Sequence, residues 1–203
     1  MIKILSLNTT DKFINLMLQN DDKILFEQTI EEKNKHSELL VLSIEQILKK
    51  SKLDYKDLNA ISVIKGPGNF MGLRAGISVA KAIDISTKIP IITIDFFELL
   101  SFGEDIDKNS LIAIKANLNN YYIQNTKSNE RYILKYNEIE NQKDAKILTN
   151  DETLSKLQNA KKIDFNFNNW AKLIYKKYQN KEFDIDIKPL YIRPPKITPR
   201  KKY

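Results

Sequence analysis

The chain has 203 residues, of which 33 are lysine or arginine and 26 are aspartate or glutamate, so its formal net charge is +7. It contains no cysteine and one histidine, which excludes disulfides, thiol nucleophiles, cysteine-bound metals and paired histidine ligands. A hydrophobic content of 42% suffices for one large or two small domains with a real core. No apolar run approaches the length of a membrane span and no signal peptide precedes the first strand, so we expect a soluble cytoplasmic protein.

Hydrophobic periodicity in the first half predicts three strands and then helices alternating with strands. The turns between the first three strands are rich in asparagine and aspartate, which favours an antiparallel meander. The later alternation favours parallel strands joined by crossover helices, so we expect an α/β fold. The expected elements are strands at 2–7, 13–18 and 23–29, a helix at 36–50, a strand at 60–64, a helix at 72–86 and a strand at 89–94.

The second half repeats this order in a weaker form, and four prolines near the carboxyl terminus indicate an extended tail. The expected elements are strands at 110–116, 121–126, 131–136 and 146–148, and helices at 151–159 and 168–180. We therefore expect an N-terminal subdomain at 1–100, a C-terminal subdomain at 101–188 and a basic, proline-containing tail at 189–203.

The positive charge is concentrated at the carboxyl terminus. Residues 1–100 carry equal numbers of basic and acidic side chains, whereas residues 188–203 carry six basic side chains and no acid. Such a segment can bind RNA phosphates, and it can equally be a solvated terminus. The candidate RNA-contact residues are Arg193, Lys196, Arg200, Lys201 and Lys202.

Four of the five glycines lie within residues 66–76, between an expected strand and an expected helix. A helix N-terminus at this place can bind phosphate through its free N–H groups. However, a P-loop would need lysine and then serine or threonine where Leu73 and Arg74 stand, and a dinucleotide fingerprint would need glycine at Met71. The alternative is a tight turn that leads into a closely packed helix.

Small residues recur every four positions along the helix expected after this loop. Gly72, Gly76 and Ala80 share one face, with Ala75, Val79 and Ala82 nearby. Glycine within a helix costs about 1 kcal/mol relative to alanine, which favours a close contact that offsets this cost. The contact can lie within the chain or with a partner protein.

The remaining polar candidates show no paired catalytic group. His36 has no evident nucleophile or carboxylate partner and is better explained as part of the start of the first helix. Arg74 stands in the first turn of a helix, where its charge opposes the helix dipole, so a partner carboxylate, an RNA phosphate or a surface ion pair would explain it. Asp95, Asp105 and Asp107 lack metal-ligand spacing and are interpreted as solvated.

Aromatic residues gather around Trp170, with Phe165, Phe167 and Tyr175 nearby. Such side chains can stack on nucleic-acid bases. Their spacing is more typical of the buried face of a helix, so we expect a core helix here.

The segment GPGNFMGLRAG, which begins at Gly66, resembles the GPGSFTGLRxG signature of the TsaB (YeaZ) family, with eight identities. His36-Ser37 followed by Leu39-Leu40 is similar to the HS…LLP stretch of that family, and Tyr191-Ile-Arg-Pro is similar to its terminal YLRP. The resemblance implies an actin/sugar-kinase/Hsp70-like α/β fold, built from two ribonuclease-H-like subdomains of which the second is reduced.

The resemblance also implies a function. Members support formation of N6-threonylcarbamoyladenosine beside the anticodon of tRNA as non-catalytic subunits that bind and activate TsaD, which carries the metal and the transfer. They act with a TsaE-like ATPase through the complex, contact TsaD through their first two helices, and form homodimers when alone. The implied interface residues are His36, Leu40, Ile44, Ile47, Gly72, Leu73, Ala75, Gly76, Val79 and Ala80. The signature loop comprises Gly66, Pro67, Gly68, Asn69, Phe70, Gly72 and Arg74.

Three departures from the family pattern bear on function. Asn8 stands where active members of the wider fold have an aspartate that helps to hold a magnesium nucleotide, and Asn69 and Met71 replace the signature's serine and threonine. A DARRxEVY-like stretch has become 115–122, without its acid and arginines. We therefore expect no catalytic residue, cofactor or metal. The alternatives are a stand-alone ATP-binding enzyme of this fold and a tRNA-binding module. We also expect Gly76→Leu to break a partner complex while leaving the chain soluble.

Overall fold

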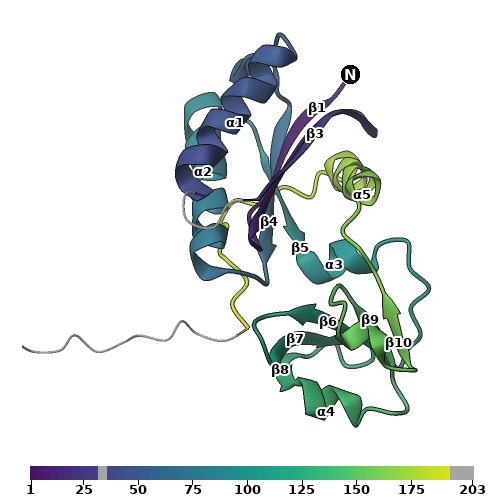
Figure 1. Cartoon of the computed structure of the whole chain (residues 1–203). Helices are drawn as coiled ribbons and strands as arrows, with labels where there is room; N and C mark the ends of the chain where they lie inside the picture. The colour runs from purple at the N-terminus through teal and green to yellow at the C-terminus, as the bar shows by residue number, and fades with distance from the viewer. Residues whose placement is uncertain (32–35, 193–203) are drawn as a thin grey trace, which may run out of the picture.

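The computed structural model describes residues 1–31 and 36–192, without the side chains of residues 36–38, and it contains two five-stranded sheets (Figure 1). The first sheet has the order β3-β2-β1-β4-β5, formed by Lys23–Glu31, Phe13–Asn20, Lys3–Asn8, Ala60–Gly66 and Ile91–Asp95. The second has the order β10-β9-β6-β7-β8, formed by Ala160–Lys162, Lys146–Thr149, Ser110–Lys115, Asn120–Asn125 and Arg131–Lys135. In each sheet an antiparallel meander continues into parallel strands, as the sequence predicts.

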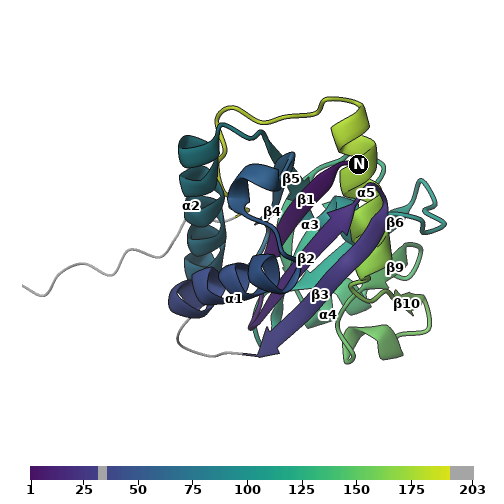
Figure 2. The same ribbon diagram turned by 90° about the horizontal axis from the view of Figure 1, so that it is seen from above.

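Helices cover both faces of the first sheet, which is why β1 is apolar on both faces. Helices α1 (His36–Lys50) and α2 (Phe70–Thr87) pack on one face, where Leu5 and Leu7 of β1 join a buried cluster. Helices α3 (Phe96–Ser101) and α5 (Phe167–Gln179) pack on the other, where Ile4 is buried. Figure 2 shows α2 and α5 on opposite sides of this sheet.

The elements predicted for the first half are confirmed, with shifts at their ends. Helix α2 begins at Phe70 rather than at residue 72, because the Asn69 side chain caps it. It ends at Thr87, where Lys88 takes the left-handed conformation with φ 63°.

In the second half the expected strands and the helix around Trp170 are confirmed, but the helix expected at 151–159 is wrong. That segment holds only the 3-10 turn η2 (Leu154–Lys156), because the Asp151 carboxylate accepts the N–H of Leu154. The chain then forms β10, which pairs in parallel with β9. Three further short helices were not predicted: η1 (Tyr55–Asp57), α3 and α4 (Tyr136–Glu140).

Helix α5 returns from the second sheet to the first. Trp170 is fully buried there, in edge contact with Phe165 at a centroid distance of 5.4 Å, so the core interpretation of this aromatic group is confirmed. The Gln19 side chain of β2 donates to the Ala171 carbonyl at 3.0 Å. The division of the chain at residues 100 and 188 stays a prediction.

A search of residues 1–31 and 36–192 for membrane spans finds no helix with the length and apolarity to cross a bilayer.

Candidate functional site

The signature loop joins β4 to α2 and packs on the turn between β1 and β2. Its Gly66–Pro67 peptide bond is cis. A Cβ atom on Gly68 would lie 2.4 Å from the Thr10 carbonyl oxygen, and the Asn69 N–H donates to that same oxygen at 2.6 Å. The close approach of two backbones explains why glycine stands at this position.

Asn69 caps the N-terminus of α2. Its Oδ1 accepts the N–H groups of Met71 and Gly72, both at 3.0 Å. These are the groups that a phosphate-binding helix would leave free for its ligand. Asparagine in place of the signature's serine therefore keeps the helix cap.

The small residues of α2 face the interior of the chain. A Cβ atom on Gly76 would lie 2.5 Å from Thr9 Oγ1 and 3.5 Å from Val63 Cγ2, and Thr9 Oγ1 donates to the Gly72 carbonyl at 2.7 Å. Ala80 is fully buried. Of the two contacts left open by the sequence, the described residues form the internal one, with β1 and β4.

The expected contact of the interface residues with a partner stays a prediction. Seven of them are buried in the chain's own core: Leu40, Ile44, Ile47, Gly72, Leu73, Gly76 and Ala80. Ala75 and Val79 are half-buried, so their contact with a partner stays a prediction. The side chain of His36 lies outside the described residues.

A largely apolar stripe lies on the solvent side of these helices; we call it the outer face. It comprises Met71, Ala75, Ser78, Ala82 and Ile85 of α2, together with the exposed apolar residues Val41 and Leu42 of α1, the helix that packs against α2. Met71 is 71% exposed, Ile85 68% and Leu42 54%. The α2 members are spaced four, three, four and three residues apart, which is the spacing of helix–helix seams. That spacing was readable in the sequence and was missed.

The final described residues form a strap that runs from α5 past the edge of the first sheet to α2 (Figure 2). Within this C-terminal strap, residues 183–192, the Asp184 N–H donates to the Ile91 carbonyl at 2.9 Å and the Asp184 carboxylate accepts the Thr93 N–H at 2.8 Å. Ile187 is buried, and the Leu190 N–H donates to the Lys65 carbonyl at 2.7 Å. The strap therefore ends on the signature loop.

The strap also explains Gly66, which has φ +120°. A Cβ atom there would lie 2.9 Å from the Leu190 carbonyl oxygen. Next to it, the Tyr191 ring stacks on Phe70 at a centroid distance of 5.2 Å, and the Arg74 guanidinium lies 5.4 Å from the same Phe70 ring. The two sequence motifs named separately above thus form one structural unit.

Asn8 lies at the end of β1 in a chain of buried amides. Its Oδ1 accepts the N–H and the hydroxyl of Thr10 at 3.0 and 2.8 Å, and its Nδ2 donates to Asn15 Oδ1 at 3.0 Å. Asn15 in turn donates to the Thr29 hydroxyl at 2.9 Å. The oxygen that an aspartate would offer to a cation is here part of a neutral internal network.

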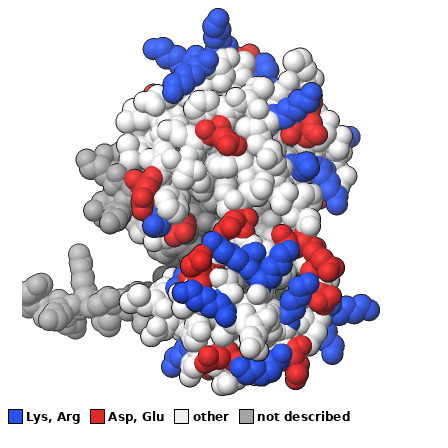
Figure 3. Space-filling model, turned by 45° about the vertical axis from the view of Figure 1, so that its right-hand side comes forward, with Lys and Arg blue, Asp and Glu red and all other residues white. Residues whose placement is uncertain are grey.

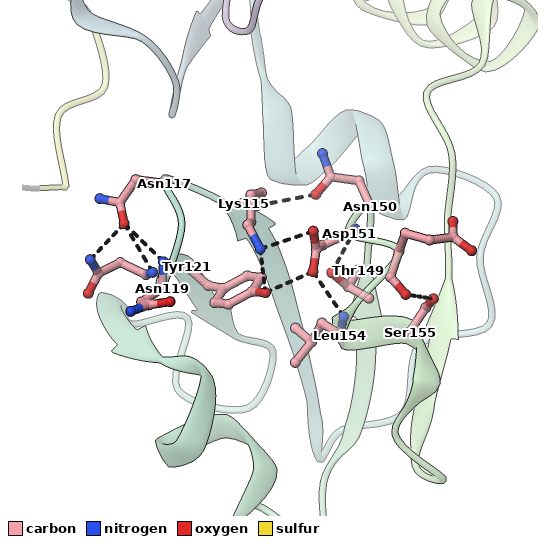
Figure 4. Close-up of polar contacts among 11 residues, drawn as sticks. Lys115, Asn117, Asn119, Tyr121, Thr149, Asn150, Asp151, Leu154 and Ser155 are labelled. Carbon is pink, nitrogen blue, oxygen red and sulfur yellow. Dashed lines mark hydrogen bonds and ion pairs between the residues drawn. The ribbon is translucent and has the colours of Figure 1, made fainter.

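In the 115–122 stretch, Lys115 and Tyr121 form an ionic cluster with Asp151, whose part the sequence did not predict (Figure 4). Lys115 Nζ donates to Tyr121 Oη at 2.8 Å and lies 3.1 Å from Asp151 Oδ2, while Tyr121 Oη donates to Asp151 Oδ1 at 2.7 Å. Burial alone would raise the pKa of Asp151, but hydrogen bonds from Tyr121, Leu154 and Lys115 lower it below its ordinary value. Lys115, Tyr121 and Asp151 satisfy one another's hydrogen-bonding and charged groups, so we interpret the cluster as stabilising the fold rather than as catalytic.

Replacing Asp151 with asparagine is expected to lower the free energy of unfolding at pH 7 by about 1 kcal/mol, after discounting for solvent screening at the partly exposed Lys115. Because the pKa of Asp151 is lowered in the folded chain, this stabilisation is fully present at neutral pH. It is lost as the pH falls below the ordinary aspartate range and the carboxylate is protonated. Urea denaturation at several pH values measures both effects. Asp144→Asn, on an exposed loop of the same sheet, is the control, and an equal loss there would contradict the role of the cluster.

The solvated interpretation is wrong for Asp95. Its carboxylate is buried, lies 2.5 Å from the Arg131 guanidinium and accepts the Phe97 N–H at 2.9 Å. Burial raises the pKa of Asp95 despite the opposing effect of Arg131. Because Asp95 ends β5 and Arg131 begins β8, the pair links the two sheets. Asp105 and Asp107 are exposed and lie 3.7 and 3.6 Å from Lys146.

Basic and acidic groups are mixed on the surface of the second sheet. In Figure 3 blue and red groups lie side by side over the lower half of the molecule. Lys161 pairs with Glu104 at 2.5 Å, and Lys162 pairs with Glu152 at 2.6 Å. No group of three metal-binding side chains occurs in the described ranges. The candidate RNA-contact residues Arg193, Lys196, Arg200, Lys201 and Lys202 lie outside the described residues.

Three comparisons with known proteins agree on one family. The profile described as "TsaD: tRNA N6-adenosine threonylcarbamoyltransferase" matches residues 23–180. The TsaB protein of Buchnera aphidicola subsp. Acyrthosiphon pisum (strain APS) is 36% identical over 93 residues, 44% of this chain and 42% of the relative. That of Bacillus subtilis (strain 168) is 30% identical over 98 residues, 48% and 43% of the two chains. The chain thus spans less than half the length of these relatives.

Among solved structures, two from Pseudomonas aeruginosa match nearly the whole chain. A protein described as similar to peptidase YEAZ has a TM-score of 0.72 at 15% identity, covering 95% of this chain and 100% of that one. A structure titled YeaZ has a TM-score of 0.70 at 14% identity, with coverages of 94% and 100%. At this identity the likeness shows the fold, and the expected actin/sugar-kinase/Hsp70-like α/β fold with two sheets is confirmed.

Proposed function

The chain belongs to the family of TsaD, the tRNA N6-adenosine threonylcarbamoyltransferase, and from this premise we propose that it takes part in N6-threonylcarbamoyladenosine formation on tRNA. Its similarity to proteins named TsaB favours the role of an accessory subunit over that of the transferase. In this role it binds and activates a TsaD-like catalytic subunit, acts with a TsaE-like ATPase through the complex, and forms a homodimer when alone.

The observation that carries the proposal is the outer face of α1 and α2. An exposed apolar stripe with alternating spacings of four and three residues, on a helix already packed inside the chain, suits the docking of another protein's helix. Ala75, Ser78 and Ala82 are small side chains on this surface, so helix backbones can approach closely.

The described polar groups support a non-catalytic role. The helix cap of Asn69, the amide network of Asn8 and the cluster of Lys115 each satisfy their own hydrogen-bonding groups. A nucleophile or general base needs a free group aimed at a substrate. We therefore assign binding to the outer face and chemistry to the partner.

Ala82→Glu tests this function, because it places a charge in the middle of the outer face. We expect affinity for the TsaD-like protein of the same organism to fall at least about tenfold, since an unpaired carboxylate would be buried in the complex. Calorimetric titration of the two purified proteins measures the affinity.

Lys172→Glu, an exposed charge change on α5 across the sheet, is the matched control and should bind as the wild type does. Equal binding by Ala82→Glu and the wild type would refute the proposed interface. Stoichiometric binding and turnover of ATP by the purified chain would support the alternative of a stand-alone enzyme.

A further inference from the structure

Arg74 is a charged group that the proposed function leaves unused. It is exposed and is the fifth residue of α2, just past the first turn that Asn69 caps. No acid of residues 1–31 or 39–192 forms an ion pair with it, so the surface ion pair considered from the sequence is absent among these described side chains. By contrast Lys81, two turns later, has Asp186 of the strap near it.

The surrounding residues hold this cation in place. The Arg74 guanidinium lies over one ring, Phe70, and Phe70 is stacked on Tyr191 of the C-terminal strap. The strap is itself fixed to β4 through Leu190 and to the core through Ile187. A guanidinium held against a ring is a planar donor that loses less freedom when it binds a carboxylate through two parallel hydrogen bonds.

Arg74 also has a defined place relative to the outer face. It directly precedes Ala75 in the stripe of Met71, Ala75, Ser78, Ala82 and Ile85, which is the flanking position of a helix seam that carries interhelical ion pairs. An acid arriving there would pair with the guanidinium through charge-assisted hydrogen bonds.

We propose that Arg74 is the ionic anchor of the outer face and binds a carboxylate on the protein helix that docks there. The inference rests on the proposed function and names the chemistry of the partner. A protein carboxylate fits better than an RNA phosphate, because the neighbouring side chains Met71, Ala75 and Ser78 carry no charge. Nucleic-acid surfaces, in contrast, combine several cations.

The test is titration of the TsaD-like protein of the same organism with Arg74 variants. We expect Arg74→Gln to bind about tenfold and Arg74→Glu about a hundredfold more weakly, with the dependence of affinity on salt reduced in both. Arg74→Lys should recover part of the loss, since it keeps the charge without the planar pair of donors. Circular dichroism should show all three folded, because the side chain is exposed.

Tyr191 is the positioning residue in this arrangement. Tyr191→Ala should weaken binding severalfold, and Tyr191→Phe should restore it because the ring stack is kept. Loss of binding in both variants would show that the ring stack does not act through Arg74.

The other outcomes separate this inference from the proposed function. If Ala82→Glu abolishes binding while Arg74→Glu binds as the wild type, the inference fails and the function stands. If the wild type does not bind the TsaD-like protein, both fail. If Arg74→Glu loses tRNA binding but keeps its protein partner, the ligand is a phosphate and the inference is overturned.

Discussion

Gly76→Leu is expected to unfold or severely destabilise the chain, and its effect on partner binding will follow from that. A Cβ atom at this position already lies 2.5 Å from Thr9 Oγ1, and the further leucine carbons have only β1 and β4 to enter. We expect a loss of about 4 kcal/mol, which combines overpacking with the broken hydrogen bond from Thr9 to Gly72. Since domains are stable by only about 5–15 kcal/mol, the soluble yield should also fall. Chemical denaturation followed by circular dichroism measures the loss.

Two neighbouring variants serve as controls for Gly76→Leu. Gly76→Ala brings only one added carbon against Thr9 Oγ1, which can rotate away by giving up its hydrogen bond to Gly72, so its cost should be clearly smaller than that of leucine. Ala75→Leu lies on the half-buried side of the same turn and should change stability by at most about 0.5 kcal/mol while weakening partner binding. A Gly76→Leu protein with wild-type stability would show that the helix packs differently.

The local hydrophobic pattern was enough to predict most elements of the first half, because both faces of its sheet are covered and each helix buries one apolar stripe. The expected helix at residues 36–50 coincides with α1, since its apolar residues repeat at helical spacing. The second half was predicted less well where local and long-range interactions compete. The residues expected to form a helix at 151–159 instead supply Asp151 to Lys115 and Tyr121 and then a strand to β9. Those partners lie far away in the sequence.

The candidate site shows the same division. The glycine motif identified the loop and the family, but small residues at every fourth position do not say which surface approaches them. The residue that approaches Gly76 is Thr9, which lies far earlier in the sequence, just after the end of β1. The stack of Tyr191 on Phe70 likewise joins two motifs that no local pattern connects. The spacing of Met71, Ala75 and Ser78 could have predicted the outer face from the sequence. The pattern is weak because the stripe mixes apolar residues with small ones and a serine.

Helix α5 offers the second large effect, because it holds the far face of the first sheet. Trp170 is its largest fully buried side chain and packs with Phe165 and Phe167 in the same cluster as Ile4 and Phe97. The indole Nε1 has no hydrogen-bond partner in the described part of the chain. Its contribution is therefore apolar packing, so a ring without the N–H can replace much of it.

Trp170→Ala is accordingly expected to lower the free energy of unfolding by about 3–5 kcal/mol, through lost burial and the cavity left behind. Trp170→Phe should cost clearly less, since it keeps a ring and removes the unpaired N–H. Urea denaturation measures the stability of both variants. It is followed by circular dichroism rather than by tryptophan fluorescence, because each variant loses the only tryptophan of the chain. A loss below about 1 kcal/mol in Trp170→Ala would mean that α5 does not need this side chain to hold the sheet. Equal losses in the two variants would instead point to a hydrogen bond from the indole.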